Sequence, residues 1–254
     1  MKKFIHILLI AIIAFTGVRL DYVSAAPQDG VVSAWKLDGN SNDSVGTNNG
    51  TDTNVGYDLE YGRVAKGAGF GGTGFVNAGT STSLKATNTV SVSFWFKATT
   101  TATSFLVGKS SAQTGGWVSY GIYLNNGATN NLFYRVKTGS GTTFSDLSTT
   151  TSNATNGNWH HVVLVRNGAT QLLYYDGAQL LSGGSGTTIF YDGDFEFLIG
   201  ATSNGGLGND SRFTGSIDSV VVWFRQITAA EVTRIYNNGL STQYPFSGDV
   251  IFSY

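Results

Sequence analysis

The chain has 254 residues, carries a formal net charge of −1 with only 12% charged residues, and contains no cysteine. It has no cluster of lysine and arginine to meet a phosphate backbone, so nucleic acid is excluded as an expected partner. Without disulfides the fold depends on a hydrophobic core, which a chain of this length can bury in one domain. The 34 glycines and 2 prolines suit a β-rich protein with many turns.

The first residues, 1–25, have the pattern of a secretory signal peptide. Two lysines precede an apolar run over residues 4–15, and small residues follow up to Ala26. The run is shorter than the ~20 apolar residues of a membrane span, so we expect cleavage and no membrane insertion afterwards. The mature domain, residues 27–254, is therefore expected to be secreted and to work outside the cell or at its surface.

Short alternating or apolar runs between turn residues predict strands along most of the mature chain. The expected strands cover residues 31–37, 68–76, 90–96, 104–109, 117–124, 131–136, 195–200 and 215–224. The polar, glycine-rich stretches at 138–158 and 182–188 are predicted to be loops. The spacing of the strands predicts an all-β fold, a two-sheet antiparallel jelly-roll sandwich.

The segment from His160 to Leu181 gives the clearest local pattern. Two turn dipeptides, Asn167-Gly168 and Asp176-Gly177, separate three apolar runs. Such dipeptides are typical of tight hairpin turns of type I′, so the segment predicts a three-stranded meander.

One short helix is predicted near the C-terminus. Thr228 followed by Glu231 forms a capping-box pattern, and Gly239 stands where a left-handed residue would end the helix. The tail, residues 240–254, could add one more strand or pair with the sheet edge of another molecule.

Five segments, taken in order, resemble the laminin G-like domains of the concanavalin A-like lectin/glucanase superfamily. They are AWKLDGNSNDSVGTNNGT at 34–51, GRVAKGAGF at 62–70 with VNAG after it, TVSVSFWFKA at 89–98, GNWHHVVLVRNGATQLLYYDG at 157–177, and FLIGA at 197–201 with FTGSIDSVVVWFRQITAAEV at 213–232. Each motif is weak alone, but the ordered set covers nearly the whole mature chain. The resemblance implies the jelly-roll fold, with a concave sheet and end loops that can bind a ligand.

The resemblance also implies one structural Ca²⁺ ion, held between the N-terminal segment and the penultimate strand. Calcium prefers six to eight oxygen ligands from carboxylates, amides and carbonyls. Asp218 and Asp43 are the first candidates, and Asp38 and Asn42 come after them. The alternative is that Asp218 accepts hydrogen bonds from a loop and that Asp43 caps a turn.

Binding of a glycan or of a cell-surface protein is the predicted function. Aromatic rings can stack on sugar faces, and amides can bind hydroxyl groups. The candidate ligand-binding residues are Trp117, Tyr120, Tyr123, Tyr134, Tyr175, Asn204 and Asn209. For each of these aromatic residues the alternative is packing in the core.

Two other functions remain as alternatives. A glycoside hydrolase would need paired carboxylates, and the nearest pattern is Asp192, Asp194 and Glu196. These residues precede a late strand rather than lying on a central one, so no catalytic residue is expected. The other alternative is a structural subunit of an extracellular coat or filament, which would self-assemble through residues 249–254.

Overall fold

The computed structural model describes residues 26–110, 118–151, 153–202, 211–237 and 242–246. The predicted signal peptide and the predicted tail strand lie outside the described residues. Among the described residues, no helix is long and apolar enough to cross a membrane.

The described chain is almost entirely β-structure, as predicted. The strands are β1 (Val31–Trp35), β2 (Thr51–Asp58), β3 (Gly67–Asn77), β4 (Thr89–Lys97), β5 (Ser104–Ser110), β6 (Val118–Leu124), β7 (Asn131–Lys137), β8 (Phe144–Thr150), β9 (Trp159–Asn167), β10 (Thr170–Tyr175), β11 (Ala178–Gly183), β12 (Glu196–Ile199) and β13 (Thr214–Trp223). Two short 3₁₀ helices, η1 (Leu59–Tyr61) and η2 (Thr82–Leu84), and the helix α2 (Ala229–Tyr236) complete the elements.

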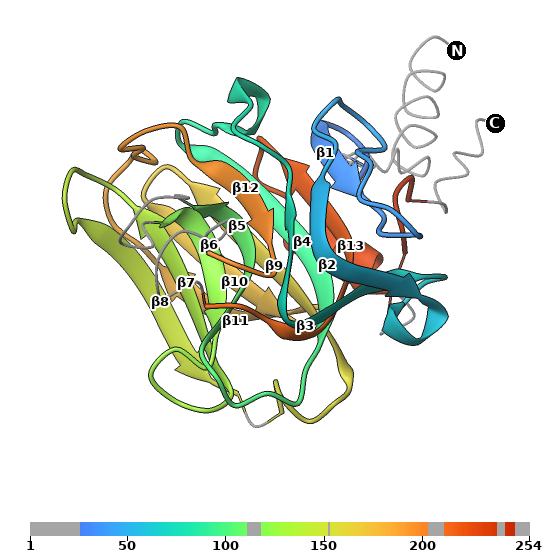
Figure 1. Cartoon of the computed structure of the whole chain (residues 1–254). Helices are drawn as coiled ribbons and strands as arrows, with labels where there is room; N and C mark the ends of the chain where they lie inside the picture. The colour runs from blue at the N-terminus through green and yellow to red at the C-terminus, as the bar shows by residue number, and fades with distance from the viewer. Residues whose placement is uncertain (1–25, 111–117, 152, 203–210, 238–241, 247–254) are drawn as a thin grey trace, which may run out of the picture.

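The strands form an antiparallel sandwich of two layers, which confirms the predicted fold class (Figure 1). The strand order is β11-β10-β9-β4-β13-β3 in the first layer and β12-β5-β6-β7-β8 in the second, with β1 on β13 and β2 on β3. The short β12 pairs with both β3 and β5, so hydrogen bonds join the layers into one continuous sheet. The sheet folds over until its end strands, β11 and β8, lie close together.

Alternate side chains of both layers meet in the main core. Val92, Phe94 and Phe96 of β4 face Ile122 and Leu124 of β6, and all five are fully buried. This alternation is the period-2 pattern that the sequence shows, because neighbouring side chains of a strand point to opposite faces.

Helix α2 covers the outer face of the first layer. Its Val232 and Ile235 pack on Val163 and Trp223, which point away from the main core. The predicted capping box is present: the Thr228 side chain accepts from the Glu231 backbone, and the Glu231 side chain accepts from Thr228. Asn237 is the left-handed residue at the helix end, and the predicted Gly239 lies outside the described residues.

Two strands lie where none was predicted. The first is β2, and the second is β8, which crosses the stretch 138–158 that was predicted to be a loop. Both have exposed polar residues on alternate positions. Each strand presents one face to solvent at an edge of the sheet, so its sequence is polar and lacks the apolar run that would predict a strand.

Candidate functional site

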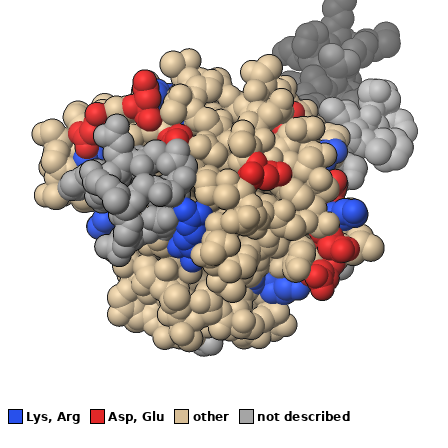
Figure 2. Space-filling view, viewed as in Figure 1, with Lys and Arg blue, Asp and Glu red and all other residues tan. Residues whose placement is uncertain are grey.

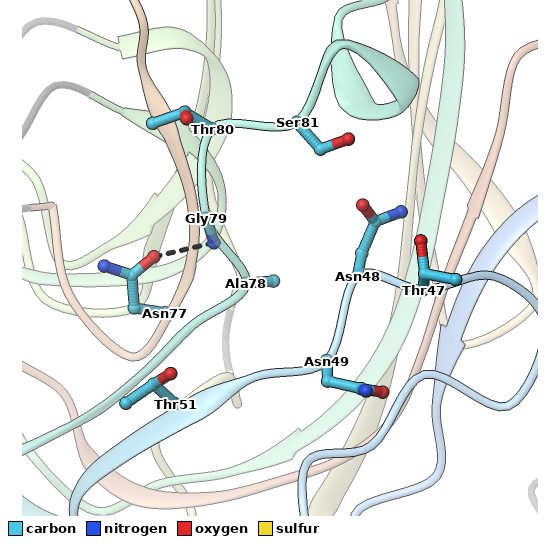
Figure 3. A pocket seen from close by; sticks show the side chains of 9 residues that line it. All are labelled: Thr47, Asn48, Asn49, Thr51, Asn77, Ala78, Gly79, Thr80 and Ser81. Atoms are coloured by element: carbon cyan, nitrogen blue, oxygen red, sulfur yellow. Dashed lines mark hydrogen bonds between the residues drawn. The ribbon is translucent and has the colours of Figure 1, made fainter.

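A polar pocket of ≈ 380 Å³ lies between two chain segments that the sequence does not mark as a pair (Figure 3). One wall is the segment leading into β2, and the other is the segment leaving β3. The lining residues are Thr47, Asn48, Asn49, Thr51, Asn77, Ala78, Gly79, Thr80 and Ser81. In Figure 3 the side chains of Asn48 and Ser81 point into the space between the walls.

The first wall is held by Asp43. Its carboxylate accepts hydrogen bonds from three backbone N–H groups: Oδ1 accepts from Ala34 (3.0 Å) and Val45 (3.0 Å), and Oδ2 accepts from Asn48 (3.1 Å). The backbone N–H of Asp43 donates in turn to Oδ1 of Asn49 at 2.9 Å. The turn is thus fixed by one acidic residue, which places Asn48 and Asn49 in the pocket wall.

Asn48 ties this wall to the core and to the opposite segment. Its Nδ2 donates to Ser33 Oγ at 2.8 Å, and its Oδ1 accepts from Ser83 Oγ at 2.9 Å. Its carbonyl accepts from Nε1 of the buried Trp35 at 2.8 Å. Asn48 is therefore a structural member of the wall, because its side-chain amide and its carbonyl are engaged within the protein.

The second wall is shaped by Asn77 and Gly79. The Asn77 Oδ1 accepts from the Gly79 backbone at 2.8 Å, and Gly79 has φ of +77°, a conformation that glycine favours. The Asn77 Nδ2 donates to Oε1 of Glu196 at 3.3 Å. Strand β12 holds the same segment, since Phe197 exchanges backbone hydrogen bonds with Ala78 and Gly79.

The pocket is chemically neutral. Seven of the nine lining residues carry hydroxyl or amide groups, and among these described residues none is charged or aromatic. Thr47, Thr51, Thr80 and Ser81 are exposed, so a ligand can reach them from solvent. The lining offers hydrogen-bond donors and acceptors, and none of the nine lining residues has a side chain that titrates near neutral pH.

Two of the four predicted calcium ligands lie together, on either side of the loop 62–66. Asp218 is fully buried, and its Oδ2 accepts from the backbone N–H groups of Arg63 (2.7 Å) and Val64 (2.9 Å). Asp38 Oδ1 accepts from the backbone of Lys66 at 3.1 Å. Burial raises the pKa of Asp218 to about 7, although the two loop N–H donors lower it, and the Asp38 charge raises it further.

The other two predicted ligands do not join them. Asp43 is committed to the pocket wall, and the exposed Asn42 bonds through its backbone to Asn40. No group of three acidic or histidine side chains gathers anywhere in the described part of the chain. The four residues therefore do not fit one calcium cage, since such an ion wants six to eight oxygens. A Ca²⁺ ion at Asp38 and Asp218 stays a prediction.

The structure corrects the prediction for Tyr120 and Tyr134. Both rings belong to the main core with at most 1% of their surface exposed, so neither has a face for a sugar. Tyr123 lies on the outer face of the second layer, packed edge-on against Phe105 at 5.1 Å. Tyr175 is half-buried and stacks on His160 at 5.0 Å, and its hydroxyl donates to Asn153.

The remaining predicted ligand residues, Trp117, Asn204 and Asn209, lie outside the described residues. Of the predicted ligand-binding residues that the structure describes, none lines the pocket. Two of the motifs that carry the family resemblance, 34–51 and VNAG, contain seven of the nine pocket residues. Neither motif shows that the two segments form a pocket, because the segments lie about thirty positions apart in the chain. The run of neutral hydroxyl and amide residues at 47–49, directly before β2, is a signal that a search for glycan-binding residues could have used.

The three carboxylates of the hydrolase alternative have separate partners. Asp192 pairs with Lys137, Asp194 pairs with Lys85, and Glu196 accepts from Asn77.

Figure 2 shows the charged side chains scattered over the visible face, with both signs present and no single large patch. A scattered surface of this kind gives no electrostatic guidance toward a strongly charged ligand.

Comparison with known proteins identifies the fold. Residues 70–233 match the family model described as the concanavalin A-like lectin/glucanases superfamily. A search of curated protein sequences found no match. Domain 4 of AbnA, a GH43 extracellular arabinanase from Geobacillus stearothermophilus solved with arabinotriose, aligns with a TM-score of 0.60 at 21% identity. That alignment covers 84% of this chain and 98% of the domain.

Two toxin binding domains have the same fold. The binding domain of Paraclostridial Mosquitocidal Protein 1 aligns with a TM-score of 0.64 at 19% identity, over 84% of this chain and 53% of that one. The binding domain of botulinum neurotoxin serotype D/C gives 0.62 at 14% identity, over 86% of this chain and 54% of that one. This chain thus spans about half of each toxin domain, and identities this low establish the fold alone. Because the family model spans more than half of the sequence, the chain belongs to the concanavalin A-like lectin/glucanases superfamily.

Proposed function

We propose that this chain is a secreted, non-enzymatic binding module that recognises a neutral carbohydrate in the pocket between residues 47–51 and 77–81. The observation that carries the proposal is the lining itself, which is rich in hydroxyl and amide groups and uncharged. Sugars present many hydroxyl groups that need paired donors and acceptors, and neutral amide and hydroxyl side chains supply both.

The size of the pocket supports a small ligand. Its volume of ≈ 380 Å³ lies at the lower end of the roughly 300–1,000 Å³ that small-molecule sites occupy. A short oligosaccharide would place one or two sugar units between the walls and extend along the exposed threonines. The walls are held by hydrogen bonds from Asp43, Asn48 and Asn77, so the site is formed before the ligand arrives.

The relatives in fold support the same class of function. Domain 4 of the arabinanase was solved with arabinotriose, and the toxin relatives are named as binding domains. An extracellular setting agrees with these relatives and with the predicted signal peptide. Arabinotriose is therefore the first probe, and a glycan array supplies the wider search.

The test combines the array with single-residue variants. Thr51→Val and Thr80→Val each remove an exposed hydroxyl that makes no hydrogen bond within the described chain, so the fold should be unchanged. We expect each variant to weaken glycan binding about threefold to tenfold, the range of one neutral hydrogen bond. The matched control is Thr150→Val, an exposed threonine at the end of β8. Glycan binding that none of these pocket variants changes would contradict the proposal.

A further inference from the structure

A second polar cluster lies between the two layers, away from the pocket. Arg166 of β9 and Gln171 of β10 come from the first layer, and Tyr134 of β7 and Ser145 of β8 come from the second. Arg166, Gln171 and Tyr134 are fully buried, and Ser145 is 4% exposed. All four side chains point inward, because their strand neighbours at two-residue spacing belong to the main core.

The Arg166 guanidinium is bound only by neutral groups. Its Nη2 donates to the carbonyls of Ser185 (2.7 Å) and Gly186 (2.6 Å). Its Nη1 donates to the Ala169 carbonyl at 3.3 Å and to Gln171 Oε1 at 3.2 Å. In the described part of the chain no carboxylate pairs with Arg166, so none of the described residues neutralises its positive charge.

The orientation of the Gln171 amide is fixed by its neighbours. Its Oε1 accepts both from Arg166 Nη1 and from Ser145 Oγ, and Ser145 Oγ itself accepts from the Ser185 backbone at 2.8 Å. A flipped amide would turn its NH₂ group toward the guanidinium, where two donors would face each other. Gln171 Nε2 therefore does not face Arg166 Nη1, and its N–H groups are available to donate to another group.

Three buried donors in this cluster lack an acceptor among the described residues: Arg166 Nε, Gln171 Nε2 and the Tyr134 hydroxyl. Tyr134 and Arg166 are close enough to interact electrostatically. Burial raises the pKa of the Tyr134 hydroxyl, and the Arg166 charge opposes that rise. Buried donors without an acceptor are costly, and a buried cation without an anion is more so.

We propose that Arg166 Nε, Gln171 Nε2 and the Tyr134 hydroxyl bind one small monovalent anion of halide size between the layers. An anion supplies the acceptor that the three donors lack and the charge that the guanidinium lacks. The full burial of the three side chains favours a spherical ion over a carboxylate or a phosphate. The loop 184–186 packs on the guanidinium through the carbonyls of Ser185 and Gly186, and it contains Gly184 and Gly186, both with positive φ.

Crystals of the full chain soaked in sodium bromide provide the direct test. We expect an anomalous bromide peak within hydrogen-bond distance of Arg166 Nε and Tyr134 Oη. Since an anion that binds only the folded state stabilises it, we also expect a higher melting temperature in sodium chloride than in sodium gluconate at the same ionic strength. Density for water alone at this position, or equal melting temperatures, would overturn the proposal.

A pair of matched variants separates the anion from general core effects. Tyr134→Phe removes one donor to the ion, and we expect about tenfold weaker halide binding, as for a hydrogen bond to a charged group. Tyr120→Phe removes a similarly buried hydroxyl, which donates to the Leu84 carbonyl at 3.1 Å, and should leave the halide dependence unchanged. Equal halide dependence in the two variants would show that the Tyr134 hydroxyl does not bind the ion, and it would overturn the proposal.

Discussion

The carboxylate of Asp43 accepts a hydrogen bond from the backbone N–H of Asn48 at 3.1 Å, and this contact joins a predicted metal ligand to the wall of the pocket. The same carboxylate also accepts from Ala34 in β1 and from Val45, so it ties the end of β1 to the turn that follows Asp43. A short acidic residue that organises three backbone donors is a common way to build a rigid turn.

Replacing Asp43 by alanine should damage both the stability and the pocket. Three backbone donors lose their acceptor, so we expect the free energy of unfolding to fall by about 2–3 kcal/mol. Glycan affinity should fall at least tenfold, because Asn48 and Asn49 lose their support. Urea unfolding and calorimetric titration measure the two effects. Asp146→Asn, on the outer face of β8, is the control, and full affinity in Asp43→Ala would show that the turn does not shape the site.

The pH dependence of stability should report on Asp218. Its pKa in the folded protein is about 7, raised chiefly by burial from the ordinary value of 3.8. The folded state therefore holds this proton more tightly than the unfolded chain does. The resulting stabilisation is complete below pH 3.8 and is lost as the pH rises to about 7. At 1.36 kcal/mol for each pKa unit, the loss is at most about 4 kcal/mol.

The Asp218→Asn variant isolates this effect, because asparagine keeps an acceptor for the Arg63 and Val64 N–H groups but does not ionise. The difference in unfolding free energy between wild type and variant should fall between pH 4 and pH 7 and stay level above that. Urea titrations across this range measure it. A difference that does not change with pH would mean that Asp218 is ionised throughout.

Calcium gives a separate prediction for Asp38 and Asp218. If the pair holds an ion, millimolar Ca²⁺ should raise the melting temperature relative to a chelator. Asp38→Asn and Asp218→Asn should each remove the rise, and Asp146→Asn should keep it. A melting curve that Ca²⁺ does not move would remove the metal site and leave both residues as acceptors for the loop 62–66.

The proposal that the protein does not hydrolyse glycans is also testable. Retaining glycosidases place two carboxyl groups about 5–5.5 Å apart across the scissile bond. Here Asp192, Asp194 and Glu196 each have a different partner, so we expect no reducing sugar to be released from any glycan that binds. Release of sugar by the wild type that Glu196→Gln abolishes would make the protein an enzyme.

Much of the fold could be predicted from local patterns. The meander over β9, β10 and β11 follows from its turns, and Asp176 and Gly177 both have the positive φ that a type I′ turn requires. The other turn differs slightly: Gly168, and not Asn167, has positive φ there. The capping box of α2 could be predicted for the same reason, since two residues three positions apart, Thr228 and Glu231, are enough to define it.

The site depended on contacts that no local pattern reveals. Tyr120 lies between Ser119 and Gly121, and Tyr134 is followed by Arg135, so the sequence around each also suits a surface aromatic. Only the packing of the two layers shows that both are buried. The pairing of β2 with β3 places Thr51 opposite Asn77, and this brings the pocket segments that contain Asn49 and Asn77 together. The register between β2 and β3 depends on which strand faces are buried throughout the sheet, so a local sequence pattern does not reveal it.

The most direct test of the carbohydrate site is to follow backbone amide signals by NMR while titrating the glycan that binds most tightly on the array. The account predicts that the largest shifts fall on residues 47–51 and 79–81, with little change at Tyr123 and Phe133 on the outer face of the second layer. Shifts concentrated on that outer face, with the pocket residues unmoved, would contradict it.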